Sequence, residues 1–437
     1  MSNEAKKSSP ASISKAEVVS NVDAGKNASL VNGIIRLTYH ESILQDSVKA
    51  YIVYSDVGNA VDSKSVLEGL PLVGTEDFKL EMEDNNDQKL KLKMIVNTVV
   101  PLFEDSQKNV VSLELVSEEY IRNEMGESRC RSRETGKVDE HVKRIFENRL
   151  KTKKKLDIET STNEYNFIGG NRKPFYMLNL LSKQGIPEDG DGNSAGFLFF
   201  ETSDGYRFKS IEGLFKQKKK KSFVFNNSPD GIKGIPAGYD GKLLDHQSDS
   251  TINIQSKMSM GAYKTKIVLF DTYNCKYQVE EQTAEQVKKK VELAGKDLPK
   301  FNKKFDTVKH DFSRTTLYVV DSGTLPGGNT EEQIKKNTED NFKAIKTLNQ
   351  SIRRYNQLFS GMMEVTIAGD FSLHAGDVIF VDIFSVDAEK SDTVNKESGG
   401  LYIIADLCHY VSNEGTYTKM NLARDSFGRK GNHSNNR

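Results

Sequence analysis

The chain has 437 residues, and its 62 basic residues are balanced by 62 acidic residues, so that its formal net charge is zero. This balance excludes a global basic field of the kind that attracts nucleic acid. The length allows roughly two to four domains. Hydrophobic residues make up 36% of the chain and tryptophan is absent, which favours several small β-units over one large core. With 16 Tyr and 22 Phe, the chain is still too aromatic to be disordered.

The cysteines and the N-terminus indicate where the protein is made. Cys130, Cys275 and Cys408 lie far apart and cannot all pair, which indicates a reducing compartment. The first ten residues contain no apolar segment typical of a secretory signal. No run approaches the roughly 18 apolar residues that a membrane-spanning helix needs. We therefore expect a soluble protein without a membrane span, made in a cytoplasm.

The N-terminal part of the chain predicts a flexible arm, residues 1–15, followed by a β-domain over residues 16–125. In this domain apolar residues alternate with charged or polar ones, which is typical of strands that bury one face. The predicted strands cover residues 34–39, 48–54, 78–82, 90–96 and 111–115. About five strands in roughly 100 residues predict a barrel or a sandwich.

Residues 126–254 predict a mixed α/β domain. Apolar side chains at helical spacing predict a first helix over residues 138–150. A second helix starts at Pro174, which suits a first helical turn, and ends before Gly185. The turn at residues 203–205 joins two apolar runs, so it predicts a β-hairpin followed by a short helix.

Two lysine-rich runs, 151–155 and 216–221, interrupt this domain. The second run could contact phosphate groups. It carries no interleaved aromatic residues and the chain has no net charge, so a solvated loop is the favoured interpretation. The sequence leaves the role of both runs open.

Residues 255–427 predict a second β-domain, and residues 281–361 are a helical insert within it. The stretch 364–422 alternates apolar and polar residues and contains turns at 374–377 and 413–415, which is typical of a compact set of paired strands. The chain then ends in a polar tail, residues 428–437.

The longest predicted helix runs from Thr330 to Phe359, and Thr330 with Gln333 predicts a capping box at its start. Apolar or small residues recur at every third or fourth position and form one stripe. The stripe comprises Ile334, Thr338, Phe342, Ile345, Leu348, Ile352, Tyr355 and Phe359. We expect the stripe to pack on protein. The residues expected to be exposed on the other face are Lys335, Lys343 and Arg353.

Three pairs of carboxylates are candidates for acid–base chemistry. They are Asp370 with Asp377, Asp382 with Asp406, and Glu201 with Asp204. Turn capping and solvated strand faces are the favoured interpretation, because no pair belongs to a local catalytic motif.

His374, His409 and Cys408 could meet in the C-terminal β-domain, as zinc ligands do. Ligand pairs normally lie a few residues apart and the sequence shows no fourth ligand, so ordinary turn and strand residues are the favoured interpretation. The glycine pairs of the chain open no helix with a nucleotide-binding pattern. We therefore predict no catalytic, cofactor-binding or metal-binding residue, and no enzyme activity.

Several short motifs follow one another in a fixed order. The C-terminal stretch contains Gly369-Asp370-Phe371, then Gly376-Asp377-Val378-Ile379, and closes with Met420-Asn421-Leu422-Ala423-Arg424. The predicted hairpin adds an aromatic strand, Glu201-Thr202, and a Ser210-Ile211-Glu212 segment. In these motifs the chain resembles the central baseplate hub proteins of T-even-like contractile-tailed bacteriophages, which are related to the hub part of injection-system spike proteins.

Patterning and resemblance together predict an α+β, mostly β chain. We expect two similar antiparallel β-barrel tube domains, a mixed α/β insert domain and a long helix near 330–359. The resemblance implies a homotrimer whose paired barrels adapt a six-fold tail tube to a three-fold spike. The chain would then be a structural virion protein of the tail baseplate, made in the cytoplasm of a host bacterium.

The resemblance also implies the partners. They are the tail tube or its initiator proteins, the central spike protein and the surrounding baseplate wedge proteins. Genomic DNA would pass through the lumen without sequence-specific binding. Two alternatives stay open: a peptidoglycan-degrading tail-tip enzyme, which needs a carboxylate pair in a cleft, and the spike-base module of a bacterial injection system.

Overall fold

The computed structural model describes residues 8–23, 25–58, 61–105, 107–190, 194–225, 235–248, 254–271, 275–283, 291–297, 304, 314–320, 329–384, 394–395 and 398–431. Its structure is mostly β, as the alternation predicts. The largest element is a mixed sheet of 14 strands that contains two sets of seven. No helix among the described residues has the length and apolar character needed to cross a bilayer.

The first set of seven strands, here called the first unit, lies in the N-terminal part of the chain. Its members are β1 (Ser12–Val19), β2 (Asn27–Ser29), β3 (Ile34–Ser42), β4 (Lys49–Asp56), β5 (Asp77–Glu83), β6 (Lys89–Glu104) and β7 (Asn109–Val116), with the short helix α1 (Val66–Gly69). They pair antiparallel in the order β3-β4-β7-β6-β5-β1-β2. All five predicted strands are found. Residues 12–15, expected in the flexible arm, belong to β1, and residues 1–7 lie outside the described part.

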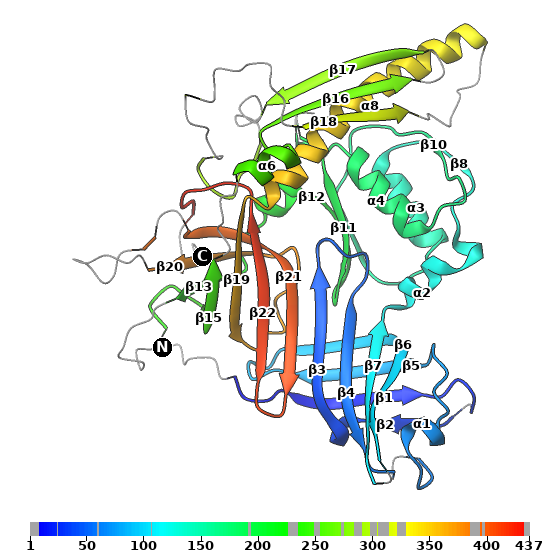
Figure 1. The fold of residues 1–437 in the computed structure, drawn as a ribbon, viewed down its shortest axis with the longest axis vertical. Helices are drawn as coiled ribbons and strands as arrows, with labels where there is room; N and C mark the ends of the chain where they lie inside the picture. The colour runs from blue at the N-terminus through cyan, green and yellow to red at the C-terminus, as the bar shows by residue number, and fades with distance from the viewer. Residues whose placement is uncertain are drawn as a thin grey trace.

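β6 is the corner of the first unit. Up to Ile95 it pairs with β5, and from Ile95 onward it pairs with β7. A bulge between Val96 and Thr98 lies where the partner changes, and a bulge bends a strand and increases its twist. As a result β1, β2, β5 and β6 cross β3, β4 and β7 (Figure 1). The apolar faces of the two layers enclose one core, with Tyr39, Phe78 and Leu113 fully buried.

The second unit is assembled from two distant parts of the chain. Its strands are β13 (Lys221–Phe225), β14 (Gly241–Lys242), β15 (Asp245–Ser248), β19 (Gly361–Ala368), β20 (Val378–Ile383), β21 (Gly400–Ser412) and β22 (Thr416–Arg424). Their order is β15-β19-β22-β21-β20-β13-β14. The first three strands come from the segment 126–254, and they pair with strands of the last third of the chain.

The two units share one strand order. Numbered along the chain within each unit, the strands follow 3-4-7-6-5-1-2 in both cases. The long strand β21 is the counterpart of β6, because it also changes partner at a bulge, between Ile404 and Asp406. One strand differs: β13 is parallel to β20, whereas β1 is antiparallel to β5.

The expected closed barrels are not found among the described residues. Instead, β3 at the end of the first unit pairs antiparallel with β21 of the second, from Ser42 opposite Asp406 to Arg36 opposite Ser412. The edge that would have to close the first unit is therefore used to join it to the second. The two units are open and share one continuous sheet (Figure 1).

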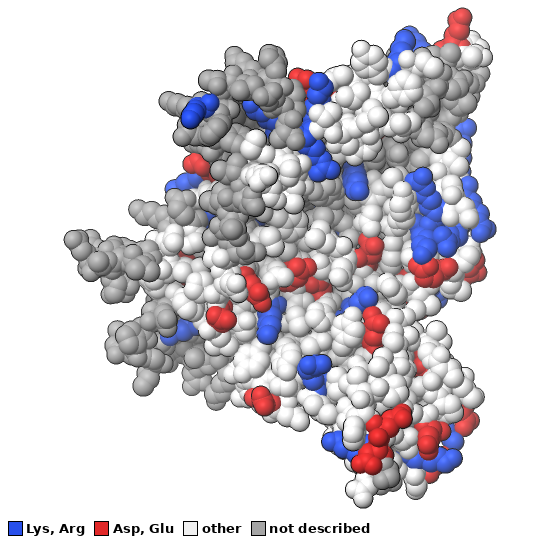
Figure 2. All heavy atoms as spheres, viewed as in Figure 1, with Lys and Arg blue, Asp and Glu red and all other residues white. Residues whose placement is uncertain are grey.

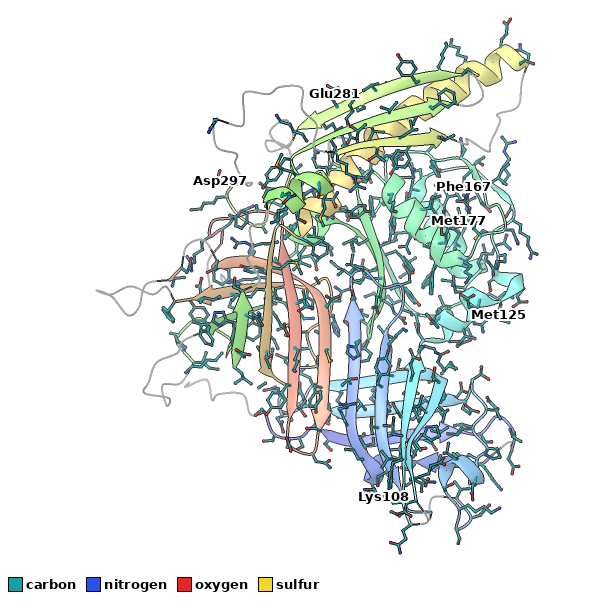
Figure 3. All side chains as sticks on the ribbon, in the orientation of Figure 1. Lys108, Met125, Phe167, Met177, Glu281 and Asp297 are labelled. Carbon is teal, nitrogen blue, oxygen red and sulfur yellow. The ribbon has the colours of Figure 1, made fainter. Side chains whose placement is uncertain are left out.

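The middle of the chain forms a small domain with an aromatic core of its own. It contains α2 (Glu118–Glu124), α3 (Val138–Asn148), α4 (Pro174–Gln184), α5 (Ile211–Lys216), β8 (Arg133–Glu134), β9 (Leu156–Ile158), β10 (Phe167–Ile168), β11 (Phe197–Thr202) and β12 (Gly205–Ser210). The predicted helices and the hairpin are confirmed, and Ser210 caps α5 by accepting a hydrogen bond from the Gly213 amide. Phe167 and Met177 lie in its aromatic core (Figure 3).

A three-stranded sheet lies next to the second unit. β16 (Lys264–Asp271) lies between β17 (Lys276–Thr283) and β18 (Arg314–Val320), with α6 (Ile254–Met260) before it. The long helix α8 (Thr330–Leu358) packs against one face of this sheet, where Ile267 and Leu269 are buried. The capping box is one residue earlier than expected, because the cap is Asn329 with Glu332, and not Thr330 with Gln333.

The burial of α8 corrects the predicted exposed face. Ile352 and Phe359 pack on protein, and Lys335 is exposed, as expected. Arg353, expected to be exposed, is fully buried, because α8 is surrounded at this level by several elements and not by one sheet. The next residue, Arg354, is also buried and pairs with Asp425 at 2.9 Å. The side chains of Ile334, Thr338, Phe342, Lys343 and Ile345 lie outside the described residues.

The packing of Ile352 on Ile267 and Leu269 yields a first prediction. Ile352→Asp should lower the free energy of unfolding by about 3 kcal/mol, because it places a carboxylate without a countercharge in an apolar contact. Lys335→Asp, on the exposed part of the same helix, should change it by less than about 0.5 kcal/mol. Urea denaturation of both variants measures this. Equal stability of the Ile352→Asp variant and the wild type would contradict the packing of α8.

Candidate functional site

A cluster of hydrogen-bonded polar side chains lies where the two units and the middle domain meet. It is called the joint cluster below and consists of Glu41 of β3, Ser203 and Asp204 of the β11–β12 turn, and His374 of the loop before β20. The Glu41 carboxylate accepts hydrogen bonds from the amides of Ser203 and Ala375, each at 2.8 Å. The imidazole of His374 lies 3.3 Å from Glu41 Oε1 and 3.2 Å from Asp204 Oδ2. The cluster therefore ties three parts of the chain together.

Protonation of the joint cluster follows from these contacts. Burial lowers the pKa of His374, but hydrogen bonds to Asp204 and Glu41 outweigh this effect and raise the pKa to about 9. The hydrogen bond to His374 lowers the pKa of Asp204 to about 2. Burial raises the pKa of Glu41, yet the bonds from His374, Ser203 and Ala375 bring it below its usual value. At neutral pH the cluster is therefore an imidazolium held between two carboxylates.

The carboxylates Asp370 and Asp377 are engaged by the second lysine run. Lys221 forms an ion pair with the fully buried Asp370, and Lys220 lies 2.8 Å from Asp377. Arg207 of β12 reaches the other oxygen of Asp377 at 3.0 Å. The solvated-loop interpretation was therefore wrong for these two lysines. They neutralise the turn carboxylates of the second unit.

The other candidate carboxylates are also held in structural contacts. Asp382 accepts two hydrogen bonds from Arg429, at 3.0 and 2.9 Å, and one from Tyr239. Asp406 accepts one from Asn421 at 3.2 Å. Arg429 belongs to the expected polar tail, so at least this part of the tail is anchored to the second unit.

Lys154, of the first lysine run, is paired with buried carboxylates. Lys154 lies 2.6 Å from both Glu201 and Glu119. Glu201 also accepts a hydrogen bond from the Val48 amide at 3.0 Å, so this bridge joins the middle domain to the first unit. Burial raises the pKa of Glu201, which Lys154 offsets only in part.

The three suggested zinc ligands are not brought together as a metal site. His409 is fully buried beside Tyr39 and Phe371, and its Nδ1 lies 3.0 Å from the Thr418 hydroxyl. Burial lowers the pKa of His409 to about 4, so the ring is neutral. The Cys408 sulfur lies 3.9 Å from His40. In the part of the chain that the structure describes, no group of three or more His, Cys, Asp or Glu side chains could hold a metal ion.

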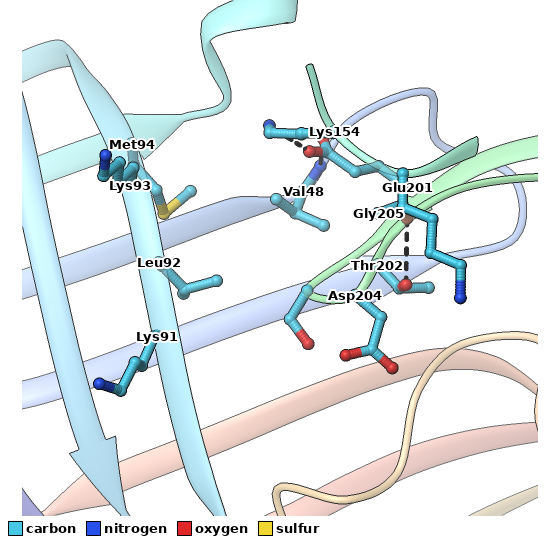
Figure 4. A pocket seen from close by; sticks show the side chains of 12 residues that line it. Val48, Lys91, Leu92, Lys93, Met94, Lys154, Glu201, Thr202, Asp204 and Gly205 are labelled. Carbon is cyan, nitrogen blue, oxygen red and sulfur yellow. Dashed lines mark hydrogen bonds and ion pairs between the residues drawn. The ribbon is translucent and has the colours of Figure 1, made fainter. Parts of the chain in front are cut away.

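A small pocket lies between β6 and the β11–β12 turn (Figure 4). Its volume is about 160 Å³, and Lys91, Met94, Glu201 and Asp204 are among its lining residues. This is below the roughly 300 Å³ at which pockets for small molecules begin. The bridge between Lys154 and Glu201 already occupies its polar side (Figure 4).

Two groups of apolar side chains are exposed on strands of the described part of the chain. On the face of the β16–β18 sheet away from α8, Tyr277, Val279, Leu317 and Val319 are exposed. A second apolar group, Val100, Leu102 and Phe103, is exposed on the second half of β6. On the face shown in Figure 2, basic side chains gather in the upper right part, and acidic and basic side chains are mixed in the lower half. Exposed apolar sheet surfaces of this kind are typical of proteins that assemble.

Sequence reasoning singled out His374, Asp377 and Asp382 but missed the residues that pair with them. Glu41, Arg207 and Arg429 are far from their partners in sequence, and no local motif surrounds them. Only the contacts that they make in the folded chain distinguish them from the many other charged residues.

The chain resembles known proteins in its fold. No protein-family model and no curated protein sequence matches the chain. Among solved structures, the tail protein from Neisseria meningitidis MC58 aligns with a TM-score of 0.50 and 9% identity, over 94% of this chain and 96% of that chain. The 43 kDa tail protein of prophage MuSo2 from Shewanella oneidensis aligns with a TM-score of 0.49 and 11% identity, over 95% and 98%. The chain therefore has the fold of a phage tail protein along nearly its whole length.

A further similarity is more remote. The E. coli c3393 protein, a component of the type VI secretion system described as similar to T4 bacteriophage tail proteins, aligns with a TM-score of 0.39 and 8% identity, over 92% of this chain and 75% of that chain.

The pairing of Lys221 with Asp370 yields a second prediction. Lys221→Met should lower the free energy of unfolding by about 3 kcal/mol, because it removes the countercharge of a fully buried carboxylate. Lys218→Met, at an exposed position of the same run, should change it by less than about 0.5 kcal/mol. If thermal or urea denaturation shows the same loss for both variants, the run acts through its net charge and not through this pair.

The joint cluster yields a third prediction. The pKa of His374 is about 9 in the folded chain and about 6.5 in the unfolded one, so its stabilising effect is complete below about pH 6.5 and is lost as the pH rises to about 9. The difference in unfolding free energy between the wild type and His374→Gln should therefore shrink across this window, by on the order of 2 kcal/mol. Urea titrations at several pH values measure it.

A matched control is His40→Gln. Burial lowers the pKa of His40, so its effect on stability should not change between pH 6.5 and 9. A pH-independent difference for the His374→Gln variant would contradict the imidazolium in the joint cluster.

Proposed function

We propose that the chain is a structural subunit of a phage tail, and more specifically a central hub subunit of a contractile-tail baseplate. The observation that carries the proposal is the pair of units with one strand order, joined into one sheet within a chain that has a tail-protein fold. Two like units in one chain allow a three-fold assembly to present six similar elements. The short hub-like motifs around Asp370, Asp377 and Glu201 support the same assignment.

The proposed assembly is a homotrimer. Three chains would place six units around the axis, so that one end matches a six-fold tail tube and the other a three-fold spike. In this arrangement the two units are the tube domains, and the middle domain, the β16–β18 sheet and α8 decorate them. Closed symmetry of this kind satisfies exposed strand edges without forming open fibres.

The proposed partners are the tail tube or its initiator proteins, the spike and the surrounding wedge proteins of a virion assembled in a bacterial cytoplasm. The exposed apolar surfaces on β6 and on the β16–β18 sheet support contacts with other protein chains. Genomic DNA would pass through the lumen. The zero net charge of the chain is compatible with a wall that does not hold phosphates.

The enzyme alternative finds less support. A glycosidase needs a carboxylate pair free to exchange protons with substrate. The candidate carboxylates Asp370, Asp377 and Asp382 are instead paired with lysine or arginine side chains. These contacts favour a structural role. A zymogram on host peptidoglycan tests for lytic activity.

The fourth prediction concerns the oligomer. Native mass spectrometry of the full chain at micromolar concentration should show a species of three chains, alone or after addition of the spike protein. A chain that remains monomeric under both conditions would contradict the hub assignment.

A further inference from the structure

The second half of β6 carries an edge that no described strand covers. β5 pairs with β6 only as far as Ile95, and beyond the bulge β6 pairs with β7 alone. Along this edge Val100, Leu102 and Phe103 are 44%, 56% and 55% exposed. A long apolar strand edge left open would pair with other chains indiscriminately, so proteins normally cover such edges.

The second unit shows what covers the same position. β21 is the counterpart of β6, and beyond its own bulge its edge is occupied by β3, with His409 opposite Tyr39 and Val411 opposite Leu37. In this paired stretch Leu407 and Val411 belong to the apolar cores, at 1% and 3% exposure. In the second unit, a strand of the same chain therefore covers the edge of the corner strand β21 beyond its bulge. In the first unit, no described strand covers the same part of β6.

The counterpart of β3 in the second unit is β15. Both strands are third in chain order within their unit, and both lie at the end of the order 3-4-7-6-5-1-2. β3 pairs with β4, and β15 pairs antiparallel with β19 in the same way. Figure 1 shows β15 and β6 on opposite sides of the molecule, so β15 cannot reach β6 of its own chain.

We propose that β15 of one copy pairs antiparallel with residues 98–104 of β6 in the next copy, which repeats the β3–β21 joint between chains. The occupant of the open edge is thus a second copy of this chain. The contact is head to tail, and three such contacts close the trimer. The inference rests on the proposed function for the number three, but the strand pairing itself follows from the shared strand order.

Pro101 fits this arrangement. Proline lacks an N–H group and in sheets is confined mainly to edge strands and bulges. A second bulge in β6 lies directly after it, between Pro101 and Phe103. The intermolecular ladder therefore uses the backbone groups on either side of Pro101, and the exposed Leu102 and Phe103 side chains become covered.

Site-directed cross-linking tests the pairing. In the full chain with Cys275→Ser, which removes the exposed native thiol, Phe103→Cys and Gln247→Cys are introduced together and singly. Paired strands place opposite residues about 5 Å apart, within reach of a short bismaleimide. The double variant should give covalent dimers and trimers, whereas each single variant should give none. Dimers from Phe103→Cys alone would show that two β6 edges meet each other, and would overturn the proposal.

A second measurement separates this proposal from the hub assignment. Leu102→Asp with Phe103→Asp should shift the trimer to folded monomers in native mass spectrometry, because both side chains are exposed in the single chain. The matched control, Leu317→Asp with Val319→Asp on the equally exposed β18, should leave the trimer intact. A trimer that survives the β6 changes, or no cross-link within a wild-type-like trimer, overturns the β15–β6 pairing alone. A wild type that stays monomeric both alone and with the spike protein overturns the hub assignment.

Discussion

The structure depends on one constraint, the sharing of β21 among three neighbours. One edge of β21 pairs with β20 at its start and with β3 of the first unit beyond the bulge, and the opposite edge pairs with β22. Because β21 pairs with strands of both units, backbone hydrogen bonds fix the orientation of one unit relative to the other. The joint cluster reinforces the end of this pairing, because Glu41 lies opposite Leu407 and accepts amide hydrogen bonds from two other elements.

The same constraint explains why the units are open. In an isolated barrel, edge strands pair with each other and no edge remains. Here the end strand β3 of the first unit pairs with the corner strand β21 of the second unit, so the corner strand β6 and the end strand β15 have no such partner among the described strands. In the proposed trimer, closed symmetry would pair these two strands between neighbouring chains. Charged pairs such as Lys221 with Asp370 then stabilise the turns between strands.

The sequence predicted the features that depend on local patterns. Alternation located β3 to β7, helical spacing located α3 and α4, and turn chemistry located the β11–β12 hairpin. It did not predict the open sheet, because strand pairing such as β3 with β21 depends on residues hundreds of positions apart. For the same reason it placed Arg353 on the surface: helical spacing gives the face of a residue but not the number of elements that surround it. The sequence also did not predict the ion pairs of Lys220 and Lys221, because the lysine run has the composition of a solvated loop.

The central claim is that two like units per chain build a ring of six around a three-fold axis. A cryo-electron-microscopy reconstruction of the purified oligomer tests it most directly. The account predicts three chains, six units of common strand order related by rotations of about 60°, which is one sixth of a turn, and β15 lying along β6 at each joint between chains. A reconstruction with another number of chains, or with the edge of β6 beyond its bulge facing solvent, would contradict it.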